Sequence, residues 1–347
     1  GLYDQAMDHA QRAVEIRDAN GGAESPQSLR SRALIGLLRY RLGEYSEAED
    51  QLRRVHEAQR RLLGDDDPDA MWSAVRLSWV LIEQGRYEEA EPILEDVAAR
   101  QRRVLGNEHR DTATTLNSLA VLYADEQRYA EAEALHSEVL AIRSSALGPS
   151  DPDTLKSMTN LAVVAFYQGR LDDAAALFAE VLEIQTETLG ADHPVTLSSA
   201  NNLAVIYERQ GRLAEAESLH RRALEAKVMV LGENHPETLS SKYNLAILLT
   251  AQRHLDQADR LHRETLAARR LALGQNHPST LDSICAVAGV AALRGDRQEA
   301  LRRLAEAVDL GYRDADSLLQ DSDFASLRTD PDFLAVVDRS RRGGSAD

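Results

Sequence analysis

The sequence of 347 residues contains a single cysteine, Cys285, and few aromatic residues, 5% of the total. One cysteine excludes an internal disulfide framework and a metal site built from thiolates. The longest apolar run, Leu161–Tyr167, is far short of the roughly 20 residues that a membrane-spanning helix needs. Residues 1–20 also lack the apolar stretch of a secretory signal peptide. These absences argue against a membrane span and favour a cytoplasmic location.

Positive charge is scarce as well, because 40 Lys and Arg residues stand against 57 Asp and Glu residues, a net charge of −17. Nucleic acids and anionic membranes both require a basic patch, so this balance argues against either as a partner. Arginine greatly outnumbers lysine, which is typical of a GC-rich bacterial genome. Because one compact core rarely exceeds about 250–300 residues, the length predicts two domains or an architecture that grows in one direction.

The sequence repeats itself with a period of 42 residues. A Leu-Gly pair recurs at this spacing, and a proline follows four residues after most of its glycines, a series that only Arg110 interrupts. An alanine recurs in the same phase at Ala6, Ala48, Ala90, Ala132, Ala174, Ala216, Ala258 and Ala300. A strict period of this length indicates a solenoid, because each repeat buries its apolar faces only by stacking on its neighbours.

Each repeat predicts two helices. In the repeat that begins at Pro194, the proline starts the first helix, where its missing N–H has no helical partner. Gly211 ends that helix with a left-handed turn, and the second helix runs on to Leu231. The turn glycine recurs in most repeats, but Gln127 and Arg253 replace it in two. The pattern predicts seven complete helix pairs over residues 21–310.

The run Asn-Leu-Ala-x-x-Tyr-x-x-x-Gly-Arg-x-x-Glu-Ala-Glu, which begins at Asn202 and is followed by Leu231-Gly232 and His235-Pro236, resembles the tetratricopeptide repeat. The repeat length and the linker are similar to those of kinesin light chains, a variety that also occurs in bacterial proteins. The resemblance implies an all-α fold, a right-handed α-solenoid (superhelix) of stacked antiparallel helix pairs. It also implies a concave groove, lined mostly by first helices, that binds peptides or other proteins without catalysis.

Both ends depart from the repeat. Residues 1–20 correspond to a second helix whose first helix is absent, so we expect a half repeat, part of a longer protein with an N-terminal fused domain. Residues 311–340 predict a C-terminal helical cap of short helices, in which Phe324, Leu327 and Phe333 cover the last repeat. The string from Asp323 to Phe333 resembles the closing segment of many bacterial repeat proteins, including some fused to serine/threonine kinases. Residues 341–347 predict a disordered tail.

Projection of the family's groove positions onto every repeat predicts one inner surface. Its basic residues are Arg30, Arg41, Lys156 and Arg209. Its acidic residues are Glu83, Asp125, Glu208 and Asp282. The groove is therefore predicted to be near neutral, and the acidic excess lies on the outer face, where it favours solubility. The predicted partner-binding residues are Arg30, Tyr40, Trp72, Trp79, Asn117, Lys156, Phe166, Asn201, Arg209 and Tyr243.

Two interpretations stay open for several of these residues. Trp72 and Trp79 lie two helical turns apart and suit a binding hot spot, but Trp79 also suits packing between neighbouring first helices. Asn117 and Asn201 suit the backbone of an extended peptide, as groove asparagines do in the resembling kinesin light chains, or a bond to the next helix. A structural role is favoured for three asparagines one residue further along, Asn160, Asn202 and Asn244.

No catalytic pattern is present. The sequence has no phosphate-binding loop, nucleophile elbow or kinase signature, and Cys285 is expected to be a small apolar residue. Histidines occur in the linkers (His109, His193, His235, His277) and at a core position of the second helix (His136, His220, His262). Neighbouring repeats lie roughly 8–10 Å apart, too far for one histidine from each to share a metal at about 2.1 Å. The sequence predicts no metal, no cofactor and no enzymatic activity.

These observations predict a non-catalytic scaffold that binds a protein or peptide in its concave groove, with neither nucleic acid nor membrane as a partner. The alternative is the regulatory or sensory region of a larger bacterial signalling enzyme, for example a serine/threonine kinase, whose catalytic domain lies upstream of residue 1. Both hypotheses can hold together.

Overall fold

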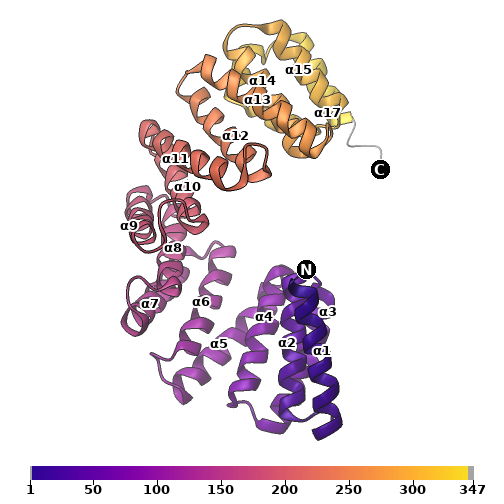
Figure 1. The fold of residues 1–347 in the computed structure, drawn as a ribbon, viewed down its shortest axis with the longest axis vertical. Helices are drawn as coiled ribbons and strands as arrows, with labels where there is room; N and C mark the ends of the chain where they lie inside the picture. Colours follow the sequence, from indigo (N-terminus) through magenta and orange to yellow (C-terminus); the bar gives the residue numbers. More distant parts are fainter. Residues whose placement is uncertain (1, 343–347) are drawn as a thin grey trace. The chain divides into compact units, whose positions relative to one another are not determined.

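The computed structural model describes residues 2–342. Within that range the chain forms seventeen α-helices and one 3₁₀-helix, with no strand. Consecutive helices pack against each other as pairs, and each pair packs on the next within its part of the chain (Figure 1). The predicted all-α fold of stacked helix pairs is therefore confirmed.

The chain divides into two compact units, Gly1–Leu177 (unit 1) and Phe178–Asp347 (unit 2), with the division inside α9 (Leu171–Leu189). Unit 1 contains α1 (Leu2–Gly21), α2 (Pro26–Leu42), α3 (Tyr45–Leu63), α4 (Pro68–Glu83), α5 (Tyr87–Val104), α6 (Arg110–Asp125), α7 (Tyr129–Leu147) and α8 (Pro152–Tyr167). Unit 2 contains α10 (Pro194–Arg209), α11 (Leu213–Leu231), α12 (Pro236–Ala251), α13 (Leu255–Leu273), α14 (Pro278–Leu293), α15 (Arg297–Asp309) and the C-terminal helices. First helices have even numbers from α2 to α14.

Small residues set the distance between the two helices of a pair. Ala204 on α10 and Ala216 on α11 are both fully buried in one cluster. In the first pair, a Cβ added to Gly36 would lie 2.6 Å from Cγ of Leu52. The repeated alanine of every complete pair is 0% exposed, at Ala48, Ala90, Ala132, Ala174, Ala216, Ala258 and Ala300. Larger side chains at these contacts would force the helices apart.

The residue before each first helix caps it. Its side chain accepts a hydrogen bond from a backbone N–H in the first turn, which satisfies one of the free donors there. The capping residues are Ser25, Asp67, His109, Asp151, His193, His235 and His277. In the histidine caps, Nδ1 is the acceptor, as in the 3.3 Å bond from the Val195 N–H to His193. The linker histidines therefore have a structural role.

Three other histidines lie in the core, at the position that Leu52, Leu94, Phe178 and Leu304 fill in other repeats. His136, His220 and His262 are at most 2% exposed. Nε2 of His220 lies 2.7 Å from a carboxylate oxygen of Glu208, whereas Nδ1 of His136 and Nδ1 of His262 have no hydrogen-bond partner among the described residues. Burial lowers the pKa of His136 and of His262 to about 4. Both side chains are consequently neutral near pH 7.

The turn between the helices of a pair requires a left-handed backbone. Most repeats place glycine there, with φ 75° at Gly211. Gln127 and Arg253, which the sequence places at the same position, adopt φ values of 63° and 65°. A residue with a Cβ is strained in this region, so these two turns keep a non-glycine side chain at a cost in stability.

The C-terminal segment forms α16 (Ala315–Gln320), a 3₁₀-helix η1 (Ser322–Leu327) and α17 (Pro331–Arg342). Asp321 caps η1, and Asp330 accepts from the N–H groups of the first turn of α17. Ser322 is the first residue of η1 and does not cap it. Because α17 reaches Arg342, it includes the first two residues of the predicted tail, and residues 343–347 lie outside the described part.

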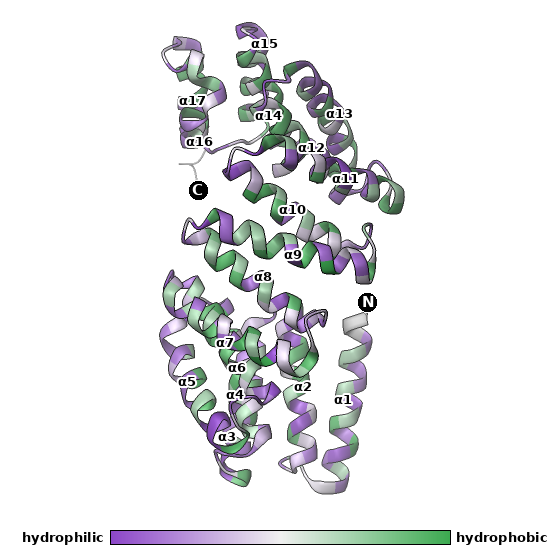
Figure 2. Cartoon of the chain, turned by 90° about the vertical axis from the view of Figure 1, so that its left-hand side faces the viewer, coloured by the Kyte–Doolittle hydropathy of each residue, from purple (hydrophilic) through white to green (hydrophobic). Residues whose placement is uncertain are grey.

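Figure 2 shows that helices throughout the chain carry hydrophobic and hydrophilic residues together. Among the described residues, none of the helices combines the length and the apolar character that a membrane crossing requires.

We predict that His262→Leu removes part of the protein's sensitivity to acid. The folded chain keeps His262 neutral down to about pH 4, whereas the unfolded chain binds a proton near the ordinary pKa of 6.5. Stability therefore falls as the pH drops from 6.5 towards 4, by up to about 3 kcal/mol for this residue. Urea unfolding at pH 7.5 and pH 4.5 should show a smaller difference for the variant. Leu94→His is the reverse control and should increase the difference; an unchanged difference in both variants contradicts the account.

We predict that Arg253→Gly stabilises the protein by up to about 1 kcal/mol, because glycine adopts the left-handed turn without a steric penalty. Gly211→Ala is the matched control, since it places a Cβ at the equivalent turn and should destabilise. Thermal and urea unfolding measure both changes, and a destabilised Arg253→Gly variant would refute the assignment of strain to this turn.

Candidate binding groove

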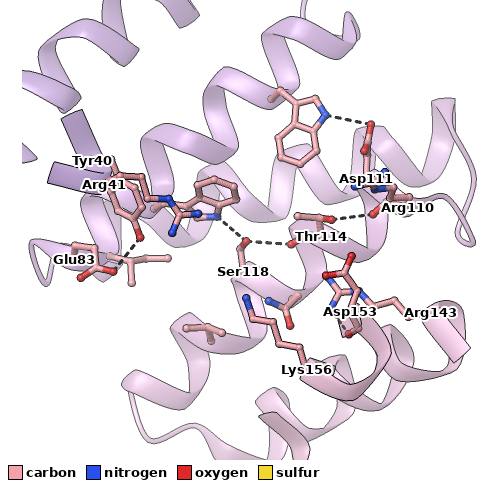
Figure 3. Close-up of a pocket in the computed structure, with 15 residues that line it drawn as sticks. Tyr40, Arg41, Glu83, Arg110, Asp111, Thr114, Ser118, Arg143, Asp153 and Lys156 are labelled. Carbon is pink, nitrogen blue, oxygen red and sulfur yellow. Dashed lines mark hydrogen bonds between the residues drawn. The ribbon is translucent and has the colours of Figure 1, made fainter. Parts of the chain in front are cut away.

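Unit 1 contains a hollow of about 660 Å³ that runs across four successive first helices, α2, α4, α6 and α8. We call it the first hollow (Figure 3). It is lined by Tyr40, Arg41, Trp72, Trp79, Ile82, Glu83, Arg110, Asp111, Thr114, Asn117, Ser118, Val121, Arg143, Asp153 and Lys156. Five of the predicted binding residues meet here, namely Tyr40, Trp72, Trp79, Asn117 and Lys156. They come together because equivalent positions of neighbouring first helices share one face of the stack.

Three aromatic rings form one wall of the first hollow. The ring centroids of Tyr40 and Trp79 are 6.4 Å apart, as are those of Trp79 and Trp72. Each indole donates to the next first helix, from Trp79 Nε1 to Ser118 Oγ at 2.8 Å and from Trp72 Nε1 to Asp111 at 3.2 Å (Figure 3). Both tryptophans therefore hold α4 against α6 while their rings stay half-buried. The two interpretations of Trp79 are compatible, because the ring both packs between helices and lines the hollow.

Charged side chains also line the first hollow. Arg41, Arg110 and Lys156 line the hollow, yet none has a carboxylate within ion-pair distance among the described residues. The acidic groups are partly engaged, since Glu83 accepts from the Tyr40 hydroxyl at 3.1 Å and Asp111 accepts from Trp72. Figure 3 shows Lys156 extending from α8 towards α6. The hollow therefore offers three unpaired cations in a chain whose net charge is −17.

Two asparagines connect the helices on the floor of the groove. Asn160 Nδ2 donates to Asn117 Oδ1 at 3.0 Å, which joins α8 to α6. Asn160 thus has the structural role favoured for it. The NH2 group of Asn117 has no partner among the described residues, so one of its amide groups stays available to a ligand in the first hollow.

Other predicted residues lie elsewhere in unit 1. Arg30 forms an ion pair with Asp69 at the start of α4 and does not line the hollow. Phe166 contacts Tyr167 edge-on, with ring centroids 5.5 Å apart. Tyr167, also at a groove position, is 61% exposed and lines a neighbouring hollow.

The predicted residues of unit 2 do not line the first hollow. Asn201 is half-buried and Arg209 is exposed on α10. Tyr243 on α12 contacts the His262 ring edge-on and lies under the Arg269 guanidinium, 4.7 Å from its ring centroid. Burial raises the pKa of Tyr243 to about 12, so its contacts are those of a packed side chain.

The sequence analysis missed several residues of the first hollow, namely Arg110, Asp111, Ser118, Arg143 and Asp153. Arg143 comes from a second helix, α7, and binds the Asp153 carbonyl and the Ser157 hydroxyl. The one available signal was at Arg110, which replaces the proline found at that position in the other complete repeats.

The expectation that the groove surface continues through the last repeat is wrong. On α14, the inner position Gly289 lies against η1, since an added Cβ would be 3.2 Å from Asp323 Oδ2. Phe324 and Leu327 pack with Ala288 and Ala292 of α14. Cys285, another inner position, contacts the same cluster, and burial raises the pKa of its thiol to about 12. The cap that was expected to cover the last repeat therefore covers its inner face.

No group of three or more His, Cys, Asp or Glu residues with metal-binding geometry occurs in the part of the chain that the structure describes.

Comparison with known proteins gives consistent matches. A family model described as tetratricopeptide repeat matches seven overlapping segments, at residues 1–61, 33–103, 80–145, 111–187, 153–227, 196–270 and 237–311. A single-residue variant of a putative kinesin light chain with nearly identical TPR-like repeats from Podosopora anserina is 28% identical. The match covers 58% of this chain and 96% of the kinesin light chain structure, with a TM-score of 0.54.

Two further solved structures share the fold. BtubC (BKLC) from P. vanneervenii is 24% identical over 70% of this chain and 91% of its own, with a TM-score of 0.53. The apo form of RapI is 11% identical over 99% of this chain and 98% of its own, with a TM-score of 0.63. No curated protein matches the chain.

We predict that Phe324→Ala makes Cys285 reactive. In the native chain the partly buried thiol should react slowly with a thiol-specific reagent at pH 8, because its raised pKa leaves little thiolate. Truncation of Phe324 should open the cap and accelerate labelling, with a loss of about 3–5 kcal/mol in stability. Leu94→Ala is the control for general destabilisation in unit 1 and should leave labelling slow. Equal acceleration in both variants contradicts a local cover over α14.

Proposed function

Because the chain belongs to the tetratricopeptide repeat family, we propose that it is a protein-interaction scaffold that binds an extended, acidic segment of a partner polypeptide in the first hollow of unit 1. The repeats and their structural relatives support the scaffold role. The side chains of the first hollow support its choice as the binding site and the acidic character of the partner segment.

The single observation that carries the proposal is the set of unpaired cations beside an aromatic wall. Arg41, Arg110 and Lys156 lack carboxylate partners among the described residues, although acidic residues outnumber basic ones in the chain. A partner carboxylate would supply the missing charge, and charge-assisted hydrogen bonds are stronger than neutral ones. Trp72 and Trp79 provide rigid surface for an apolar side chain, as binding hot spots commonly do.

An extended segment suits the shape of the hollow, which spans four helices rather than forming a closed pocket. The free amide NH2 of Asn117 suits a backbone carbonyl, so it would hold a segment without selecting its side chains. This chemistry supports a peptide-like partner and not a nucleic acid, because the same lining carries Glu83, Asp111 and Asp153.

The scaffold is proposed to act without catalysis, metal or cofactor, in the cytoplasm. The described side chains of the hollow include no nucleophile held by a base, which acyl or phosphoryl transfer would need. The alternative, a regulatory region of a larger signalling enzyme, receives no support from the matched proteins.

We predict that Trp72→Ala and Lys156→Ala weaken binding of peptides selected from a random peptide library on the wild-type chain. Loss of the indole should cost at least tenfold in Kd, as hot-spot truncations do. Lys156→Ala should raise the Kd of acidic peptides by about threefold to tenfold and reduce the dependence of Kd on salt concentration. Fluorescence anisotropy of labelled peptides measures each Kd.

Lys242→Ala is the matched control, because Lys242 forms an ion pair with Glu233 in unit 2 and should leave binding unchanged. The double variant Asn117→Ala, Asn201→Ala measures how much the two side-chain amides contribute to the Kd of the peptides. Thermal unfolding of each variant excludes misfolding as the cause. Peptides that bind wild type, Trp72→Ala and Lys156→Ala equally well would rule out the first hollow as the site.

A further inference from the structure

A second hollow, of about 440 Å³, adjoins the first in unit 1. It is lined by Val121, Ala124, Asp125, Gln127, Tyr129, His136, Asn160, Val163, Val164 and Tyr167. Val121 lines both hollows, and the hydrogen-bonded pair Asn117–Asn160 has one member in each. A segment bound in the first hollow therefore has a continuous route into the second.

Two polar groups of the second hollow are acceptors that lack a donor, the Asp125 carboxylate and the Asn160 side-chain oxygen. Asp125 has no ion-pair or hydrogen-bond partner among the described residues. His136 is 1% exposed, and its Nδ1 is buried without a partner. The amide of Asn160 already uses its NH2 group on Asn117, which leaves its oxygen. A ligand that pairs with Asp125 and with the Asn160 oxygen must bring hydrogen-bond donors.

The charge around Asp125 also favours a cation. Burial and the nearby Glu83 carboxylate raise the pKa of Asp125. Glu83 accepts only from the Tyr40 hydroxyl in the described chain. Two neighbouring carboxylates without a cation repel each other, and an incoming positive charge would relieve that repulsion.

A pair of stacked tyrosines beside the second hollow favours a planar cation. Tyr129 and Tyr167 are stacked, with an interplanar angle of 3° and ring centroids 5.7 Å apart. Tyr167 is 61% exposed, which leaves a large aromatic surface at the edge of the hollow. Arginine is the cation that stacks on such surfaces, because its guanidinium is planar and weakly hydrated. The chain makes this contact itself, where Arg128 lies 3.9 Å above the ring centroid of Tyr123 and Arg212 lies 4.0 Å above that of Tyr207.

We propose that the second hollow is a subsite for an arginine side chain of the partner polypeptide, stacked on Tyr167 and paired with Asp125. The apolar stem of the arginine lies along Val121 and Val163, and the guanidinium donates to acceptors that have no donor in the chain. The inference rests on the proposed function, since the arginine belongs to the same segment whose acidic part occupies the first hollow.

Gln127 lies at the rim of this hollow in the strained turn described above, with φ 63°. Backbone strain is often kept at functional sites. The side chain of Gln127, absent from repeats with glycine at this turn, adds a further acceptor at the subsite.

The test uses capped arginine, N-acetyl-arginine-methylamide, titrated into the chain labelled with 3-fluorotyrosine. The Tyr167 fluorine resonance is assigned with Tyr167→Phe. Capped arginine should shift this resonance in a saturable manner, whereas capped citrulline, the neutral isostere, should bind at least threefold more weakly. Asp125→Asn should weaken the binding of capped arginine by about threefold to tenfold and leave the binding of capped citrulline unchanged.

Asp50→Asn is the matched control, because Asp50 lies on α3 in unit 1, pairs with Arg54 outside both hollows and should leave arginine binding unchanged when its charge is removed. Equal affinity for arginine and citrulline, equal or tighter binding of capped lysine, insensitivity to Asp125→Asn, or no saturable shift of Tyr167 would each overturn the proposal. The two failures are distinguishable, because the arginine titration tests the second hollow alone, whereas the proposed function is tested by the effect of Trp72→Ala and Lys156→Ala on selected peptides.

Discussion

The close approach of two helices at a pair of small residues is the constraint on which the rest of this structure depends. Ala204 and Ala216 are both fully buried where α10 meets α11, and the equivalent alanine of every complete pair is equally inaccessible. A pair packed this tightly still has apolar faces that only the next pair can cover. Stacking therefore follows, and it places the same inner positions of successive first helices side by side.

The stack divides the polar residues into two classes. Between neighbouring turns, arginines bind acids of the preceding repeat, as Arg86 binds Glu49 and Arg128 binds Glu91. These pairs use acidic residues for contacts within the chain, each of modest value because the groups are partly exposed. The inner face of unit 1 is different, because Arg41, Arg110 and Lys156 have no carboxylate partner and Asp125 has no partner among the described residues. Uncompensated groups of this kind are more readily explained by a ligand than by folding.

Periodicity explains how much of this was predictable. Tyr40, Trp72, Trp79, Asn117 and Lys156 lie at projected positions, and they meet because the projection needs only the 42-residue spacing. Contacts that depend on the rotation between repeats could not be predicted, such as the entry of Arg143 from a second helix. A bond from Asn117 to the next helix was one of the two expected roles, but its partner Asn160 was not identified.

The placement of η1 on α14 follows from a segment outside the period, for which no repeat offers a template. The division inside α9 has no counterpart in the sequence either, since the period continues through it without a change.

The most direct test is the crystal structure of the chain bound to a library-selected peptide. The account predicts a peptide lying along the inner faces of α2, α4, α6 and α8, with a carboxylate beside Lys156 or Arg110 and an apolar side chain against Trp72. A peptide bound to the outer helices α3, α5 and α7, or to α14 in place of η1, would contradict it.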